Sequence, residues 1–385
     1  MIIFVVGRSN FMEVELREVK NTHDKKAFIK FQLNLYKGHP CYIPPLISDE
    51  MEMLDETRNP IFENAESRLF LAHKEGKIVG RIAAIINWAE VKDQGRSKMR
   101  FGWYDVVDDL EVSKALIAKV EKLAKENNLK EVEGPVGFSN LDKAGLLIKG
   151  FDEIGTMVTL YNHPYYAEHL EKLGYNKHLD WVEYNIVLPG GVTPPKIVKF
   201  SDVISKRYNF KPKKFKDKSE LKELVDPMFE LLDATYSILP SYVPITRKQI
   251  DYYRRKYINF INPDYVSAVE DEKGEMVAFA ITMPSYSKAL QKAKGKLFPF
   301  GWYHLLKANR KNNKVAFYLV GVKPEHQSKG VTAILFNEMG KTFEKYGIKY
   351  METNPELEDN KNVQALWSAY NPTQNKTRRS YIKTL

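Results

Sequence analysis

The stretch KVAFYLVGVKPEHQSKGVTAILFNEMGKTFEK, residues 314–345, decides the fold. It opens with a short apolar run at 315–322, rich in β-branched and aromatic residues, which is the pattern of a buried strand. A polar segment at 323–330 then leads into apolar residues at helical spacing. A helix that follows a strand in this way directs its first, unpaired N–H groups and the positive end of its dipole at one spot. The stretch therefore predicts a site for a phosphate or pyrophosphate.

Two residues of this segment favour an anion. Gly330 lacks the Cβ that would hold a phosphate away from the backbone, and Lys329 can add a full positive charge. The alternative is an ordinary strand-turn-helix connection that binds no ligand.

The run Gln327-Ser328-Lys329-Gly330-Val331-Thr332, after a strand that ends in Val-x-Pro, resembles the acyl-CoA loop of the GCN5-related N-acetyltransferase (GNAT) superfamily. Thr332 stands where that family has glycine or alanine, and Ala333 follows it. The resemblance implies acetyl-CoA or a longer acyl-CoA as co-substrate and no metal. The residues that it implies in binding the co-substrate are Val320, Val322, Gln327, Ser328, Lys329, Gly330, Val331, Thr332 and Ala333.

The order of predicted elements occurs twice. The run LPGGVTPP at 188–195 cannot sustain a helix or a strand, and on both sides of it we expect strand, helix, hairpin, strand, helix, strand, helix and strand. We expect residues 200–210 to be polar and extended. The fold class is thus α/β (α+β), with two tandem GNAT-like domains at 1–190 and 196–385, each a mixed, mostly antiparallel sheet flanked by helices. Residues 1–11 are predicted to be an extension.

Several further stretches resemble one bacterial tandem-domain group of the superfamily, similar to bacterial ceramide synthase-type acyltransferases. They are HPCYIPPL at 39–46, VGRIAAIIN at 79–87, EGPVGFS at 133–139 and YNHPYYAEHLEKLGY at 161–175. The run FGWY also occurs twice, at 101–104 and 300–303, but at places that are not equivalent, so we treat this repeat as coincidence.

The two halves are not expected to work alike. Where the C-terminal half has its glycine loop, the N-terminal half has Asp108, Asp109 and Glu111. Carboxylates there satisfy the helix dipole themselves and repel a pyrophosphate. We therefore expect acyl-CoA in the C-terminal half only, and a degenerate N-terminal half that forms a wall of the acceptor pocket.

Transfer of an acyl group from a thioester to an amine needs a base for the incoming ammonium group. Glu352, on the strand that follows the loop helix, is our candidate, although alternation of the strand does not show which face it occupies. Glu325 is better explained as a turn cap, and His326 as a phosphate contact or a solvated residue.

The leaving thiolate can also take a proton. Where the family usually places a tyrosine for this purpose, this chain has Trp367, which cannot donate as a phenol does and is better explained as a core residue. Tyr370 and Tyr318 are our substitutes, with solvent as the alternative.

Composition limits the remaining choices. The 385 residues carry a formal charge of +10, which favours acidic partners, and a single cysteine, Cys41, which fits a reducing compartment. No stretch is long and apolar enough for a membrane span, and no residues have metal-ligand spacing. We expect a cytoplasmic protein or one bound peripherally at the inner membrane surface.

We therefore expect an acyl-CoA-dependent N-acyltransferase. A long-chain acyl donor with a lipid-like amine is the first hypothesis, and the basic runs at 211–216 and 247–256 would then suit an anionic membrane surface. An acetyltransferase acting on a small amine or peptide is the second. A non-catalytic CoA-binding or interaction protein is the third, and nucleic acid is disfavoured as a partner.

Overall fold

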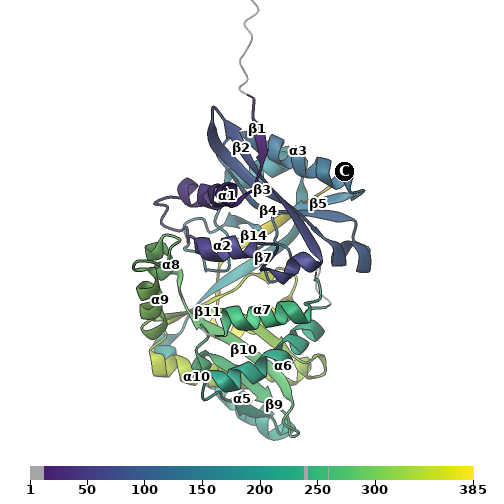
Figure 1. Ribbon diagram of the computed structural model, residues 1–385. Helices are drawn as coiled ribbons and strands as arrows, with labels where there is room; N and C mark the ends of the chain where they lie inside the picture. The colour runs from purple at the N-terminus through teal and green to yellow at the C-terminus, as the bar shows by residue number, and fades with distance from the viewer. Residues whose placement is uncertain (1–12, 238–241, 259) are drawn as a thin grey trace, which may run out of the picture.

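The computed structural model describes residues 13–237, 242–258 and 260–385, so the predicted extension at 1–11 lies outside the described residues. Two halves lie one above the other and share one sheet (Figure 1). From one edge to the other, its strands run β1-β2-β3-β4-β5-β14-β7-β12-β11-β10-β9-β8, and two short strands lie off this path, β13 on β7 and β6 on β14. Helices flank the sheet, which is mostly antiparallel, as the sequence predicted.

The helices and strands divide between the two halves of the chain. The first half contains β1 (Glu15–Glu18), α1 (Thr22–Leu35), α2 (Ile47–Met53), β2 (Ala65–Lys74), β3 (Lys77–Asn87), β4 (Lys98–Val106), α3 (Leu110–Glu126), β5 (Glu131–Gly134), β6 (Leu146–Lys149), α4 (Tyr165–Lys172) and β7 (Asn176–Val187). The second contains α5 (Pro195–Tyr208), β8 (Lys211–Lys213), α6 (Lys218–Tyr236), α7 (Arg247–Tyr257), β9 (Val266–Glu270), β10 (Met276–Pro284), α8 (Ser287–Ala293), α9 (Gly301–Arg310), β11 (Lys314–Val322), α10 (Thr332–Tyr346), β12 (Tyr350–Thr353), β13 (Glu356–Leu357), α11 (Lys361–Ala365) and β14 (Thr373–Thr384).

One predicted element is wrong. Residues 200–210, expected to be extended, belong mostly to helix α5, which begins at Pro195. Proline is favoured in the first helical turn, where its missing N–H needs no partner. The buried residues Ile197, Ser201 and Ile204 recur at helical spacing. The other faces are polar or exposed, which hid this helical period in the sequence.

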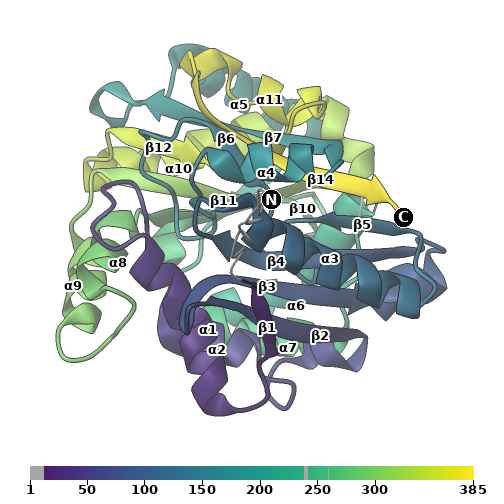
Figure 2. The same ribbon diagram turned by 90° about the horizontal axis from the view of Figure 1, so that it is seen from above.

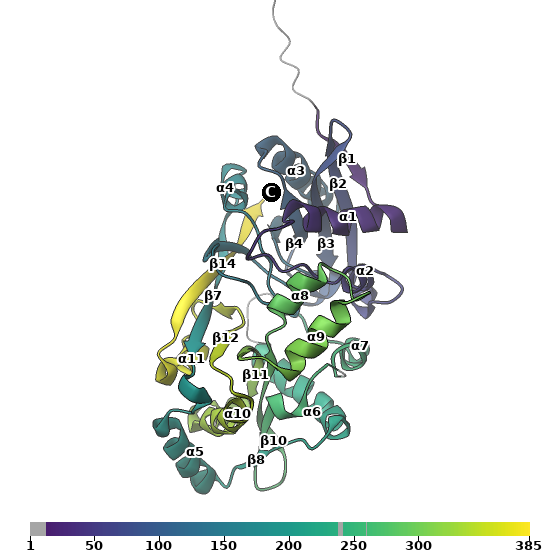
Figure 3. The ribbon, with the colours of Figure 1, turned by 90° about the vertical axis from the view of Figure 1, so that its left-hand side faces the viewer.

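The strand that closes the chain belongs to the sheet of the first half. Along β14, Tyr381 pairs with Gly134 of β5, while β7 passes into the second half and pairs Asn185 with Glu352 of β12. β7 and β14 are themselves antiparallel neighbours, and Figure 3 shows them running together from one half into the other. Figure 2 shows the C-terminus beside β5. A cut at the predicted boundary of 190 and 196 would therefore separate β14 from β5.

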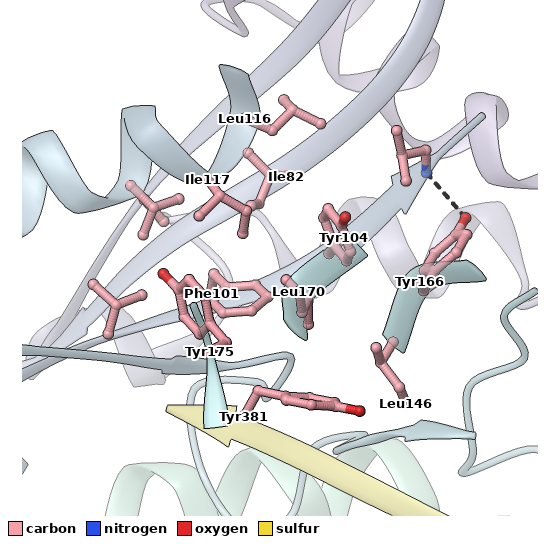
Figure 4. Close-up of a cluster of buried hydrophobic side chains, with 14 of the residues drawn as sticks. Ile82, Phe101, Tyr104, Leu116, Ile117, Leu146, Tyr166, Leu170, Tyr175 and Tyr381 are labelled. Carbon is pink, nitrogen blue, oxygen red and sulfur yellow. Dashed lines mark hydrogen bonds between the residues drawn. The ribbon is translucent and has the colours of Figure 1, made fainter. Parts of the chain in front are cut away.

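The hydrophobic core of the first half includes a side chain from this last strand. In Figure 4, Tyr381 lies beneath Phe101 and Tyr175, and the buried Tyr166 accepts a hydrogen bond from the backbone N–H of Val106 at 2.9 Å. The second half has its own core around α10. The exchange of strands thus joins the two cores.

A row of buried charges follows the exchanged strands. Lys376 of β14, with no exposed surface, pairs with Glu352 of β12 and, at 3.3 Å, with Glu183 of β7. Glu183 also accepts from Arg378 at 2.6 Å, and Glu352 lies 2.6 Å from Lys314 of β11. Each carboxylate therefore lies between two cations, and Lys376 of β14 joins the carboxylates of β7 and β12.

Candidate active site

The two parallel strands of the second half, β11 and β12, separate next to Tyr318 and Glu352, two of the residues that the sequence suggested for proton transfer. β11 and β12 pair from Lys314 opposite Tyr350 as far as Phe317 opposite Thr353. The register of β10 against β11 shifts at the same level, so that Tyr318 forms a bulge. Beyond it, β12 no longer pairs with the backbone of residues 318–322. Bulges of this kind re-aim side chains and end strand pairing next to active sites.

The predicted pyrophosphate loop follows this strand. Residues 324–329 form a 3₁₀ turn, and α10 starts directly after it. Lys329 Nζ lies 3.0 Å from His326 Nδ1, and Gln327 donates to the carbonyl of Val322 at 3.3 Å. Ser328 is exposed, so it can contact a ligand without rearrangement. The nearby ammonium and burial both hold the pKa of His326 below its ordinary value, burial being the larger cause. His326 is therefore poorly suited to carry a proton.

The structure gives Gly330 a different role from the one inferred. Its φ of 73° is in the left-handed region that glycine adopts without strain. A Cβ there would lie 2.7 Å from the ring of Phe200 on α5, so the missing side chain faces a protein neighbour. Glycine is thus required by backbone and packing, and any phosphate must approach from another side.

The remaining loop residues start α10. Val331 and Ala333 are buried and Thr332 is half-buried. Val331 has no exposed surface, so its side chain belongs to the core and does not contact a ligand. Thr332, which stands where the family has glycine or alanine, is the first residue of α10, and its side chain is partly exposed.

A residue that the sequence did not single out, Glu356, lies just past the separation of the strands. It belongs to β13, where it pairs with Val182 of β7. Trp367 donates its Nε1–H to Glu356 Oε1 at 2.7 Å, whereas Glu356 Oε2 is buried without a hydrogen-bond partner among the described residues. Burial raises the pKa of this carboxyl to about 8, against the opposing effects of the Trp367 hydrogen bond and of the nearby Thr353 hydroxyl. A buried carboxyl oxygen without a hydrogen-bond partner lowers the stability of the fold unless a ligand supplies the missing hydrogen bond.

The surroundings of Glu356 connect it to the strand that would hold acyl-CoA. Tyr236 of α6 donates its hydroxyl to the carbonyl of Val320 at 3.3 Å. Burial, and then the nearby charge of Glu356, raise the pKa of Tyr236 to about 12. Glu356 therefore lies near Tyr236, which contacts the backbone of β11.

Trp367, predicted to be a core residue, has no exposed surface and packs edge-on against Phe317 at a centroid distance of 4.8 Å. It also positions Glu356 through the hydrogen bond described above. The tryptophan thus fixes the carboxyl's orientation from the core.

Glu352 has a different environment. Both of its oxygens are already engaged, Oε1 by Lys376 and Oε2 by Lys314 at 2.6 Å. Burial by itself would raise the pKa of Glu352, but these two cations outweigh it and hold the pKa below its ordinary value. A carboxylate held between two ammonium groups is poorly suited to accept a proton from a third.

The two candidate tyrosines pack against different apolar clusters. Tyr318 occupies the bulge and packs against the apolar cluster that contains Met283 and Tyr286. Tyr370 packs edge-on against Phe336 at 6.1 Å, next to Trp367. Burial raises the pKa of Tyr318 and Tyr370, so both keep the phenolic proton at neutral pH.

In the first half the equivalent space is filled by the chain itself. β4 and β5 are parallel as far as Arg100 opposite Glu133, and the chain after β5 then returns to β4, where Val136 donates its N–H to the carbonyl of Phe101 at 2.8 Å. A Cβ at Gly102 would lie 2.6 Å from the carbonyl oxygen of Val136. A thioester cannot occupy this gap.

A groove of about 540 Å³ lies beside the loop, between α6 and the β9–β10 turn. Its lining includes two lysines, Lys213 and Lys323, and six glutamates: Glu220, Glu223, Glu230, Glu270, Glu275 and Glu325. The lysines pair with Glu270 and Glu275, at 2.6 and 3.1 Å. We do not assign the groove to CoA, because its carboxylates outnumber its ammonium groups and disfavour phosphates. Among residues 13–237, 242–258 and 260–385, no three metal-binding side chains lie close enough together to hold an ion. No helix in the same ranges is both long and apolar enough to cross a bilayer.

The arrangement of two joined halves, each with parallel strands that separate at a bulge, is that of the tandem GNAT fold. A tandem GNAT protein of the clavulanic acid biosynthesis pathway superposes with a TM-score of 0.57 at 12% identity, covering 97% of this chain and 98% of that one. No protein-family model matches the chain.

Two curated proteins resemble the chain in sequence. Bacterial ceramide synthase of Caulobacter vibrioides is 29% identical over 382 residues, which is 95% of this chain and 96% of that protein. Protein YghO of Escherichia coli K12 is 28% identical over 314 residues, 81% of this chain and 79% of that protein.

Proposed function

We propose that this protein is an acyl-CoA-dependent N-acyltransferase, with acyl-CoA held by the second half. The observation that carries the proposal is Glu356, a half-buried residue whose carboxyl has a raised pKa and one buried, unpartnered oxygen, beside strands that separate at a bulge. The tandem GNAT fold supports the same reaction class.

In the proposed reaction the thioester lies along the backbone of 318–322, and the pantetheine enters from the loop at 327–333. A backbone N–H near the Tyr318 bulge polarises the thioester carbonyl. Glu356 takes a proton from the ammonium group, and the free amine attacks the carbonyl carbon directly. The C–S bond then breaks, Tyr318 or Tyr370 protonates the thiolate of CoA, and the second proton released by the nitrogen restores the phenol of that tyrosine. No covalent enzyme intermediate is formed.

For the substrates, we propose a long-chain acyl donor and a lipid-like amine. The support is the similarity to a bacterial ceramide synthase along nearly the whole of both chains. Apolar side chains also contact Tyr318 on the side of α8, among them Met283 and Leu290, and such a lining suits an acyl chain. An acetyltransferase for a small amine or peptide is the second candidate, since the fold by itself does not select acyl length.

The first test measures the thermal midpoint with CoA, acetyl-CoA and palmitoyl-CoA. A ligand of the folded state raises the midpoint. In Ser328→Glu, which adds a carboxylate to the loop at an exposed position, we expect the shift to be lost. Ala118→Glu, which adds the same charge on the exposed face of α3, should keep it.

Turnover is then measured by release of free CoA with a sphingoid base or with a small primary amine. We expect palmitoyl-CoA with the sphingoid base to react faster by tenfold or more. Faster reaction of acetyl-CoA with the small amine would select the second candidate. Binding without turnover of either pair would leave a CoA-binding protein.

A further inference from the structure

The stretch from Met276 to Pro324 contains no aspartate or glutamate. Within it, helices α8 and α9, the loop between them and the residue that follows α9 carry seven cations: Lys288, Lys292, Lys294, Lys296, Lys307, Arg310 and Lys311. All seven side chains are exposed, and none forms an ion pair with a described residue. This hairpin is therefore a surface of uncompensated positive charge.

The basic runs noted in the sequence are different. At 211–216, Lys213 pairs with Glu270 at 2.6 Å and Lys214 with Glu338 at 3.2 Å. At 247–256, Arg247, Lys248 and Arg254 each pair with a carboxylate. About half of the cations in these runs are paired within the protein, so the runs are weaker candidates for an anionic partner than the α8–α9 hairpin.

The same hairpin exposes large apolar side chains. Their exposed fractions are 77% for Phe298, 69% for Phe300, 45% for Trp302, 50% for Tyr303 and 46% for Leu306. Trp302, Tyr303 and Leu306 follow one face of α9, whereas Leu305 and Ala308, on its inner face, pack against the apolar cluster around Met283. We call the outer residues 298–306, with the seven cations, the α9 surface.

The α9 surface has a fixed position in the molecule. Gln291 of α8 donates to the carbonyl of Pro40 at 2.6 Å, and Gly295 accepts from the N–H of Ile47 at 2.9 Å, so the hairpin is bound to the first half. Its inner cluster contacts Tyr318 at the bulge. Figure 3 shows α8 and α9 at the junction of the two halves. The surface is therefore next to the separated strands of the candidate site.

We propose that the α9 surface docks the protein on an anionic lipid bilayer, with the aromatic side chains entering the headgroup boundary and the cations contacting lipid phosphates. Phenylalanine, tryptophan and tyrosine together with exposed lysines are the composition that interfacial helices use. An anionic bilayer complements the unpaired charge. Docking here would bring a bilayer-resident amine or acyl chain to the α8 side of Tyr318. This last consequence rests on the proposed function, but the docking itself does not.

The test is flotation of the full chain with vesicles of phosphatidylcholine alone or with one-third phosphatidylglycerol. We expect the protein to float with the anionic vesicles and to remain behind with the neutral ones. Two variants remove the two halves of the surface: Phe298→Ser with Phe300→Ser, and Lys294→Glu with Lys296→Glu and Lys307→Glu. Each should lower the bound fraction at limiting lipid at least tenfold.

The matched control is Lys122→Glu with Lys125→Glu and Lys130→Glu, exposed residues of the first half, which lowers the net charge equally. It should still float. Equal loss in control and charge variant would show attraction by net charge alone and overturn the proposal, as would failure of the wild type to float.

Light scattering without lipid tests the alternative that a second copy of the chain covers the α9 surface. A dimer that the Phe298 and Phe300 changes dissociate would assign the surface to a second copy of the chain and overturn lipid docking. The CoA-dependent thermal shift separates the two proposals, because changes to the α9 surface should leave it intact. Flotation without any acyl transfer would remove the proposed function and leave the docking surface.

Discussion

At the scale of single residues, Glu352 and Glu356 are four positions apart in the sequence, yet the pKa values of their carboxyl groups are shifted in opposite directions. Both lie near the end of β12, but the first is enclosed by two lysines and the second has one tryptophan donor and one unpartnered oxygen. Opposite charges lower the pKa of Glu352, and burial raises that of Glu356. Groups whose surroundings shift their pKa toward the working pH are candidates for proton transfer.

If Glu356 is the base, it works only when ionised. With its pKa raised to about 8, kcat/KM should rise about tenfold per pH unit below 8 and level off above it. Glu356→Gln should lower kcat on the order of 10²- to 10⁴-fold and remove this dependence. A pH–rate profile of both proteins measures this, and an unchanged profile in the variant would assign the base elsewhere.

The same shift has a consequence for stability. Because the folded state binds the proton of Glu356 more tightly than the unfolded chain does, this residue stabilises the folded state least at high pH. Wild type should therefore lose stability relative to Glu356→Gln as the pH rises from about 4.5 to 8. Thermal midpoints across this window provide the fold control for the kinetic test.

At the scale of elements, the exchanged strands explain why charges are buried so deeply. Lys376 of β14 compensates Glu183 of β7 and Glu352 of β12 at once. Removing one member of a buried ion pair leaves the remaining charge without full compensation.

We expect Lys376→Met to destabilise the protein by about 3–5 kcal/mol. Lys383 lies on the same strand as Lys376 and forms a partly exposed ion pair with Glu121 of α3. Lys383→Met should therefore lower the stability by at most about 1 kcal/mol. Urea unfolding of the two variants measures the difference. Equal, small losses would mean that solvent reaches the Lys376 site.

The elements also show that a run of four residues does not determine its own conformation. FGWY at 101–104 lies in strand β4, with Trp103 at the bulge, whereas FGWY at 300–303 starts helix α9. The two runs are identical, so their conformations are set by what lies around them: strands β3 and β5 in the first case, and helix α8 in the second.

At the scale of the whole molecule, the two halves depend on each other through β7 and β14. The N-terminal half expressed as residues 13–190 lacks β14, which would leave one edge of β5 unpaired and Tyr381 absent from its core. We expect this fragment to be unfolded or aggregated.

A second fragment restores the missing strand. Residue 373 pairs with 185, so a short loop can join residues 13–187 directly to 373–385. We expect this fusion to be soluble and to unfold cooperatively, as monitored by circular dichroism in urea. A stable 13–190 fragment would show that β14 is dispensable for the first half.

The sequence by itself determined the local features: the β2–β3 hairpin, the strand and helix on either side of the loop at 323–330, and the fold class, because apolar periodicity and turn residues act over short distances. It also pointed to Trp367 as a core residue. It did not show α5, whose apolar face is narrow, nor the pairing of β14 with β5, which joins residues about 250 positions apart in a way that no local pattern encodes.

Only the tertiary structure distinguished Glu356 from Glu352. Both are glutamates near the end of one strand, and their acidity depends on lysines and a tryptophan brought in by β11, β14 and the segment after α11. Likewise, the basic runs of the sequence did not show which cations are paired. Charge and burial act through space, so the chemistry of this chain is set by neighbours that are distant in sequence.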